Sequence, residues 1–114
     1  MAANPVPNPQ HTLTIEHLVS ADGTPTLLCR GRIGVETSSM FKHEVKSLAP
    51  NHKQIQADLS GVNFVDSSGL GAVLASFMSA KSAGCELKLI NVQPQVRDLL
   101  DMTRLSAVFD GKGS

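Results

Sequence analysis

A chain of 114 residues is long enough for one domain with a single buried core and too short for two ordinary domains. Its 10 basic side chains balance 10 acidic ones, which excludes the long-range positive field that draws proteins to nucleic acid or to an anionic membrane. The sequence also contains no apolar run as long as a membrane span, and its N-terminus lacks the basic and apolar regions of a signal peptide. We therefore expect a cytoplasmic protein that recognises its partners locally, with no membrane span and no direct contact with nucleic acid.

The two ends of the chain have the composition of loosely held segments. Residues 1–10 contain three prolines and three Asn or Gln residues, which predicts a flexible N-terminal arm, and residues 111–114 predict a frayed tail. The domain itself is expected over residues 11–110.

The first predicted elements form a β-hairpin. In "HTLTIEHLV" the apolar Leu13 and Ile15 alternate with polar residues, as in a half-buried strand. "SADGTP" supplies an Asp-Gly turn before a second strand, "TLLCRGRI". The pair is expected to be antiparallel.

A helix over about residues 37–48 and a third strand follow. Thr37 or Ser38 can cap the helix, and "APN" ends it. The apolar face of the helix is formed by Phe41, Val45 and Leu48. The segment "KQIQADLSGVNFVD" alternates as a strand up to a predicted turn at Ser60-Gly61 and then continues as an extension. Its inward residues are Ile55, Ala57 and Leu59.

A second helix is predicted over residues 67–83, closed by Gly84, and a third over 94–103, begun by Pro94. The expected apolar faces are Leu70, Val73, Leu74 and Phe77 in the second helix, and Val96, Leu99, Leu100 and Thr103 in the third. "CELKLINV" between them predicts a strand, and "SAVFD" a short last strand. The order β-β-α-β-α-β-α-β predicts an α/β domain: a mixed β-sheet with an N-terminal antiparallel hairpin, parallel pairs and three main helices.

The junction in "NFVDSSGLGAVLASF" is the candidate site. Asp66 and Ser67 fall at the carboxyl end of a strand, where ligands and modified groups gather in α/β sheets. A phosphate on a serine in the first turn of a helix would meet backbone N–H donors and a favourable dipole. The alternative is structural, because Asp, Ser and Gly are the residues that any strand-to-helix turn uses.

Other chemistries lack their motifs. "DSSGLG" is not the GxSxG turn of a hydrolase, and neither a Walker loop nor a complete dinucleotide fingerprint occurs. The histidines show no metal-ligand spacing, and Cys29 and Cys85 lie in apolar segments without a CxxC spacing. We expect no enzyme activity, no cofactor and two cysteines that are small core side chains.

Two stretches, "ADLSGVNFVDSSGLGAVL" and "GCELKLINVQPQVRDLLDMTRLSAVF", resemble the STAS domain family, specifically the stand-alone bacterial anti-sigma factor antagonists. The resemblance covers about residues 11–110 and implies a STAS-like fold. It also implies partner switching, in which the unphosphorylated protein binds an anti-sigma factor that is also a serine kinase and thereby frees a sigma factor.

In such proteins the kinase, which supplies ATP and Mg²⁺, phosphorylates the first serine after the aspartate of the motif, and a serine phosphatase reverses the reaction. The resemblance places this phosphoacceptor at Ser67. The partner-binding residues that it implies are Asp66, Ser68, Gly69, Leu70, Gly34 and Thr37.

One position departs from the family pattern. Many antagonists carry Gly-x-Leu/Ile-Asp before the first helix, whereas this chain has Gly31-Arg32-Ile33-Gly34. Gly34 indicates either an altered kinase interface or a backbone need for a tight turn. The alternative function that the resemblance leaves open is a non-switching scaffold or accessory STAS domain, as in a stressosome-like assembly or a lipid-transport complex.

Overall fold

The computed structural model describes residues 12–103. Its elements are β1 (Leu13–Val19), β2 (Pro25–Ile33), α1 (Ser38–Leu48), the short 3-10 helix η2 (Ala49–Asn51), β3 (Gln54–Val65), α2 (Ser67–Ser82), β4 (Glu86–Ile90) and α3 (Pro94–Met102). The predicted order is confirmed from the hairpin to the third helix. The predicted last strand, the N-terminal arm and the C-terminal tail lie outside the described residues.

The sheet is mixed, as expected. Its strand order is β1-β2-β3-β4, with β1 and β2 antiparallel and the other two pairs parallel. The hairpin turn depends on Gly23, whose φ of +87° few other residues adopt, and on Asp22, whose Oδ1 accepts the Thr24 N–H at 3.0 Å. Because β2 and β3 run in the same direction, their carboxyl ends reach the same edge of the sheet.

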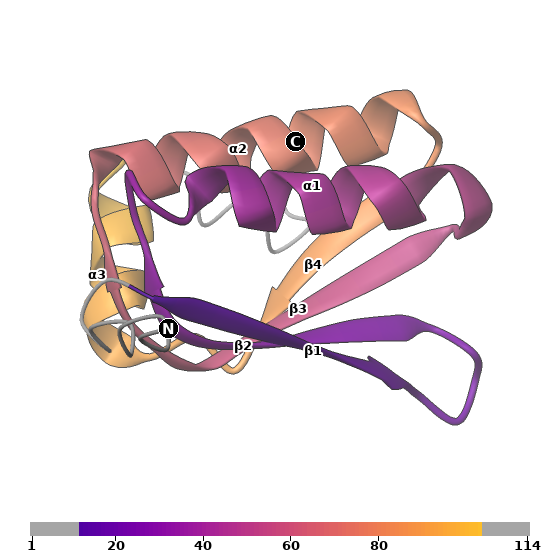
Figure 1. The fold of residues 1–114 in the computed structure, drawn as a ribbon, viewed down its shortest axis with the longest axis horizontal. Coiled ribbons are helices and arrows are strands. Elements are labelled where there is room, and N and C mark those ends of the chain that lie inside the picture. Colours follow the sequence, from indigo (N-terminus) through magenta and orange to yellow (C-terminus); the bar gives the residue numbers. More distant parts are fainter. Residues whose placement is uncertain (1–11, 104–114) are drawn as a thin grey trace, which may run out of the picture.

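The helices lie in two places. In Figure 1, α1 and α2 lie side by side above the sheet, and α3 stands apart at the left-hand end. Two glutamine side chains fasten α3 to β3: Gln93 Nε2 donates to the Ser60 carbonyl at 2.6 Å and Gln95 Nε2 to the Asn63 carbonyl at 3.4 Å.

The core lies between the sheet and the α1–α2 layer. Phe41 and Val45 of α1 are fully buried there, as are the predicted inward residues of β3, Ile55, Ala57 and Leu59. Cys29 and Cys85 are buried free thiols, as predicted. Burial is the main cause that raises the pKa of the Cys29 thiol to about 12, so this cysteine behaves as a small apolar side chain.

The buried face of α2 differs from the expected one. Its buried residues are Gly69, Ala72, Val73, Ser76 and Ala80, whereas Leu70, Leu74 and Phe77 are only partly buried. Ser76 is accommodated because its hydroxyl donates to the Ala72 carbonyl at 2.7 Å. The sequence pattern favoured the larger side chains, but α2 must fit against both α1 and the sheet, and small residues allow that close approach.

Three smaller expectations were also wrong. Ser60-Gly61 is not a turn, because β3 runs continuously through it, with a register shift against β2 between Leu28 and Arg30. Thr103 is exposed and does not belong to the apolar face of α3, whereas Leu48 packs half-buried against the core as expected. Thr37 precedes α1 as its N-cap residue, but its side chain makes no capping hydrogen bond to the helix.

Candidate functional site: the β3–α2 junction

The predicted site lies at the edge where β2 and β3 both end. Ile33 pairs with Val65 at the ends of these strands, and the Asp66 N–H donates to the Ile33 carbonyl at 3.3 Å. The loop after β2 and the loop after β3 therefore meet at the left-hand side of Figure 1, where α1 and α2 both begin. The parallel strand pair explains why residues some thirty positions apart, such as Val35 and Asp66, share one site.

The Asp66 side chain joins three segments of this edge. As the N-cap of α2, it accepts the Gly69 N–H on Oδ1 at 2.8 Å. Its Oδ2 accepts the Val35 N–H at 3.3 Å and lies 3.8 Å from Arg32 Nη2. The Gly69 hydrogen bond is the main cause that lowers the pKa of the Asp66 carboxyl, with Val35 and the Arg32 charge acting in the same direction. The site thus holds a fixed carboxylate.

Arg32 and Phe64 extend this arrangement across the ends of β2 and β3. The Arg32 Cζ lies 4.1 Å from the centroid of the Phe64 ring, in cation–π geometry. Phe64 is 42% exposed and Val35 is 70% exposed, so apolar groups reach the surface on both strands' ends. Neither Phe64 nor Val35 was a site candidate from the sequence. The expected parallel pairing of β2 and β3 was the signal that could have placed both residues near Asp66.

Gly34 lies close to the Asp66 carboxylate. A Cβ atom at residue 34 would lie 2.7 Å from Asp66 Oδ2 and 3.2 Å from Arg32 Nε. The φ of Gly34 is not among the positive values of the described chain, so its conformation does not require glycine. A side chain at residue 34 would therefore require the Asp66 carboxylate to shift.

The backbone around Gly34 also forms a turn. The Gly34 carbonyl accepts the Thr37 and Ser38 N–H groups at 3.0 and 2.8 Å. The Thr37 hydroxyl accepts the Gly34 N–H at 2.9 Å and donates to the Arg32 carbonyl at 2.8 Å. Thr37 therefore holds the turn that leads from β2 into α1 instead of capping the helix.

The other predicted site residues differ in exposure. Ser67 and Ser68 are exposed in the first turn of α2, and Leu70 is half-buried. Thr37, Gly34 and Gly69 are buried, and a Cβ at Gly69 would collide with the Ile33 carbonyl. Their part in partner binding stays a prediction, but the structure brings all seven predicted positions to one edge.

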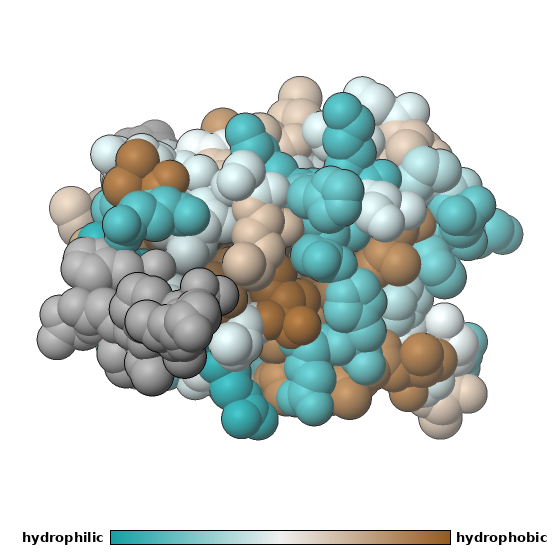
Figure 2. Space-filling model, in the orientation of Figure 1, coloured by the Kyte–Doolittle hydropathy of each residue, from teal (hydrophilic) through white to brown (hydrophobic). Residues whose placement is uncertain are grey.

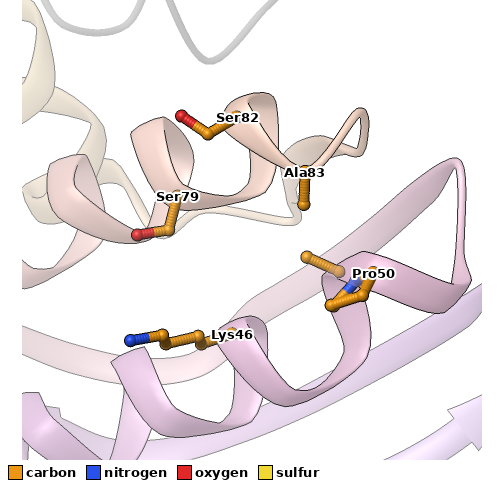
Figure 3. A pocket seen from close by; sticks show the side chains of 6 residues that line it. Lys46, Pro50, Ser79, Ser82 and Ala83 are labelled. Carbon is orange, nitrogen blue, oxygen red and sulfur yellow. The ribbon is translucent and has the colours of Figure 1, made fainter.

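One depression in the surface lies away from this edge. Figure 3 shows it between the C-terminal parts of α1 and α2. Its volume is about 380 Å³, and it is lined by Lys46, Ala49, Pro50, Ser79, Ser82 and Ala83. Within residues 12–103, no cluster of three His, Cys, Asp or Glu side chains could hold a metal ion. Across the same residues, no helix is long and apolar enough to cross a membrane.

Comparison with known proteins gives the family. Residues 16–110 match the STAS domain model described as "Mlab, STAS domain". The chain is 30% identical over 80 residues to the anti-sigma-B factor antagonist of Bacillus subtilis strain 168, covering 70% of this chain and 73% of that one. It is 31% identical over 81 residues to the anti-sigma F factor antagonist of Paenibacillus polymyxa, covering 69% of each.

Solved structures share the fold at low identity. An anti-sigma factor antagonist from Mycobacterium paratuberculosis superposes with a TM-score of 0.74 at 20% identity, over 87% of this chain and 84% of that chain. The anti-sigma factor antagonist SpoIIAA in its unphosphorylated form gives 0.62 at 16% identity, over 78% and 83%. The chain therefore belongs to the STAS domain family, and its curated relatives include anti-sigma factor antagonists.

Proposed function

We propose that this protein is an anti-sigma factor antagonist that acts by partner switching. The unphosphorylated form binds an anti-sigma factor that is also a serine kinase, and this binding frees a sigma factor. Phosphorylation of Ser67 ends the interaction, and a serine phosphatase restores it. The observation that supports this most is the exposed Ser67 side chain at the first residue of α2, next to the fixed Asp66 carboxylate.

The chemistry requires only a hydroxyl from this chain. The kinase would transfer the γ-phosphoryl group of ATP to Ser67 Oγ, with the hydroxyl proton passing to a base on the kinase and ADP leaving. The phosphatase would cleave the new O–P bond with water. A phosphate at the start of a helix of 16 residues meets a favourable dipole, so the fold stays intact while the docking surface gains a charge of about −1.5 to −2.

The test uses purified candidate anti-sigma kinases with Mg²⁺ and ATP. We expect a single phosphate mass increase on the parent and on Ser68→Ala, and none on Ser67→Ala. Ser67→Ala should still bind the kinase, whereas Ser67→Asp should melt close to the parent and lose binding, because new charge in the contact costs several kcal/mol. Phosphate on Ser68, or tight binding by Ser67→Asp, would contradict the proposal.

An accessory STAS domain that does not switch is the second candidate. Gly34 favours it, because this chain lacks the acidic residue of the antagonist pattern. The matching family model is also one described by the name Mlab. In this case Ser67→Ala and Ser67→Asp would bind a stable partner equally well, and no kinase would modify the parent.

A further inference from the structure

Two of the contacts that Arg32 makes are weak enough for a stronger anion to replace. Its Nη2 lies 3.8 Å from Asp66 Oδ2, which is beyond hydrogen-bond length, so the attraction between them is coulombic. Its guanidinium lies over the Phe64 ring, and such contacts are weak at a surface that water reaches. The Arg32 side chain is itself 26% exposed.

Asp66 does not depend on Arg32 for its hydrogen bonds. The Gly69 N–H occupies Oδ1 at 2.8 Å and the Val35 N–H occupies Oδ2 at 3.3 Å. If Arg32 moved away, the carboxylate would keep both donors and its place at the N-cap of α2. The cation can therefore respond to a stronger anion without loss of the local structure.

Ser67 would supply that anion on phosphorylation. It follows Asp66 directly, and consecutive Cα atoms are about 3.8 Å apart. A phosphate carries more negative charge than the Asp66 carboxylate and offers three acceptor oxygens that match the planar guanidinium fork. We propose that Arg32 leaves Phe64 and Asp66 and pairs with the phosphate of phosphorylated Ser67.

This inference rests on the proposed function and names how the site responds to modification. Phosphorylation would change the edge where β2 and β3 end in two ways at once. A negative charge is added at Ser67, and the aromatic face of Phe64 loses the cation that covers it. A partner that contacts both strand ends would lose a cation at one position and meet an anion at another.

The experiment installs phosphoserine at residue 67 during translation, so that no kinase is needed. The phosphate is then titrated by ³¹P NMR in the parent, Arg32→Gln, Arg32→Lys and Arg30→Gln. Arg30 is the matched control, since it is an exposed arginine of the same strand that lies over Gly61. We expect Arg32→Gln to raise the titration midpoint by about one pH unit, Arg32→Lys to give an intermediate midpoint, and Arg30→Gln to match the parent.

Proton NMR of the arginine side chain gives a second readout. In the unmodified protein the Arg32 side-chain protons should be shifted upfield by the Phe64 ring, and phosphorylation should remove most of that shift. Equal midpoints in the parent and Arg32→Gln, or Arg32 protons that stay upfield in the phosphoprotein, would overturn the inference. If no kinase modifies Ser67, the proposed function fails while this titration still gives its answer.

Discussion

At the scale of single residues, Asp66 does the most to organise the site. One carboxylate caps α2 through Gly69, holds the loop after β2 through Val35, and attracts Arg32. The same side chain lies against Gly34, where an added Cβ would come within 2.7 Å of Asp66 Oδ2. Residue 34 and residue 66 are therefore coupled, and a change at one has to be judged with the other.

Asp66→Ala should destabilise the protein by about 1 kcal/mol at neutral pH, because it removes the N-cap of α2. Asp66→Asn is the matched control, since asparagine caps nearly as well and loses only the charge. Urea unfolding of the three proteins measures both effects.

The pH dependence of this contribution follows from the lowered pKa of Asp66. A carboxyl whose pKa is lower in the folded than in the unfolded state stabilises the protein above its ordinary pKa, and the contribution disappears as the pH falls through the folded value. The difference between the parent and Asp66→Ala should therefore shrink in acid. A difference that stays constant down to strongly acid pH would count against the charged cap.

At the scale of elements, the packing of α2 against β2 and α1 decides where Ser67 sits. Gly69 approaches the backbone of Ile33 at the end of β2, and Ser76 and Ala80 continue the buried face farther along the helix. The first turn of α2 is thus fixed against the sheet, while the hydroxyls of Ser67 and Ser68 remain exposed.

Two glycines of α2 should respond oppositely to alanine. At Gly69 the new Cβ would meet the Ile33 carbonyl and its Cγ2, so Gly69→Ala should cost about 1–3 kcal/mol. At Gly71 no atom lies within 4 Å of the new Cβ, so Gly71→Ala should stabilise the protein by about 0.5–1 kcal/mol through helix propensity. Equal changes in the thermal unfolding midpoint for Gly69→Ala and Gly71→Ala would argue against this packing of α2 on the end of β2.

The two phenylalanines of the helical layer should also differ. Phe41 is fully buried in α1, so Phe41→Ala should cost about 3–5 kcal/mol. Phe77 is only partly buried against the core, so Phe77→Ala should cost clearly less. The unfolding midpoints in guanidinium chloride measure both costs. A larger loss of stability for Phe77→Ala than for Phe41→Ala would contradict a core centred on Phe41.

At the scale of the whole molecule, charge is balanced and the surface is mixed. Figure 2 shows hydrophobic side chains in separate patches among hydrophilic ones, including the end of the β1–β2 hairpin, where Leu18 and Val19 are exposed. The formal net charge of +0 supplies no general attraction to polyanions. We therefore expect partner choice to depend on local features, and we propose the edge around Asp66 as one of them.

The protein should not bind duplex DNA beyond nonspecific affinity, because it lacks the net positive charge that neutralises phosphates. Fluorescence anisotropy with a labelled duplex at low and physiological salt measures this. A tight complex that weakens steeply with salt would show that the chain acts on DNA directly.

Local signals in the sequence were sufficient to determine most of the fold. Alternating apolar residues, the Asp-Gly turn, Pro94 and Gly84 placed the hairpin, the strands and the helices close to their observed bounds. They also placed Asp66 and Ser67 at a strand end, because such a junction depends on residues that are neighbours in the chain.

Only the tertiary structure decided which side chains meet across that edge. Arg32, Val35 and Phe64 join Asp66 because β2 and β3 are parallel and end together, and no periodicity in one segment reports its register with another. The small buried face of α2 has the same origin. From the sequence alone, the larger side chains of a helix are expected to be the buried ones. In the assembled fold, the short distances from α2 to α1 and to the sheet determine which side chains fit, and these favour small residues.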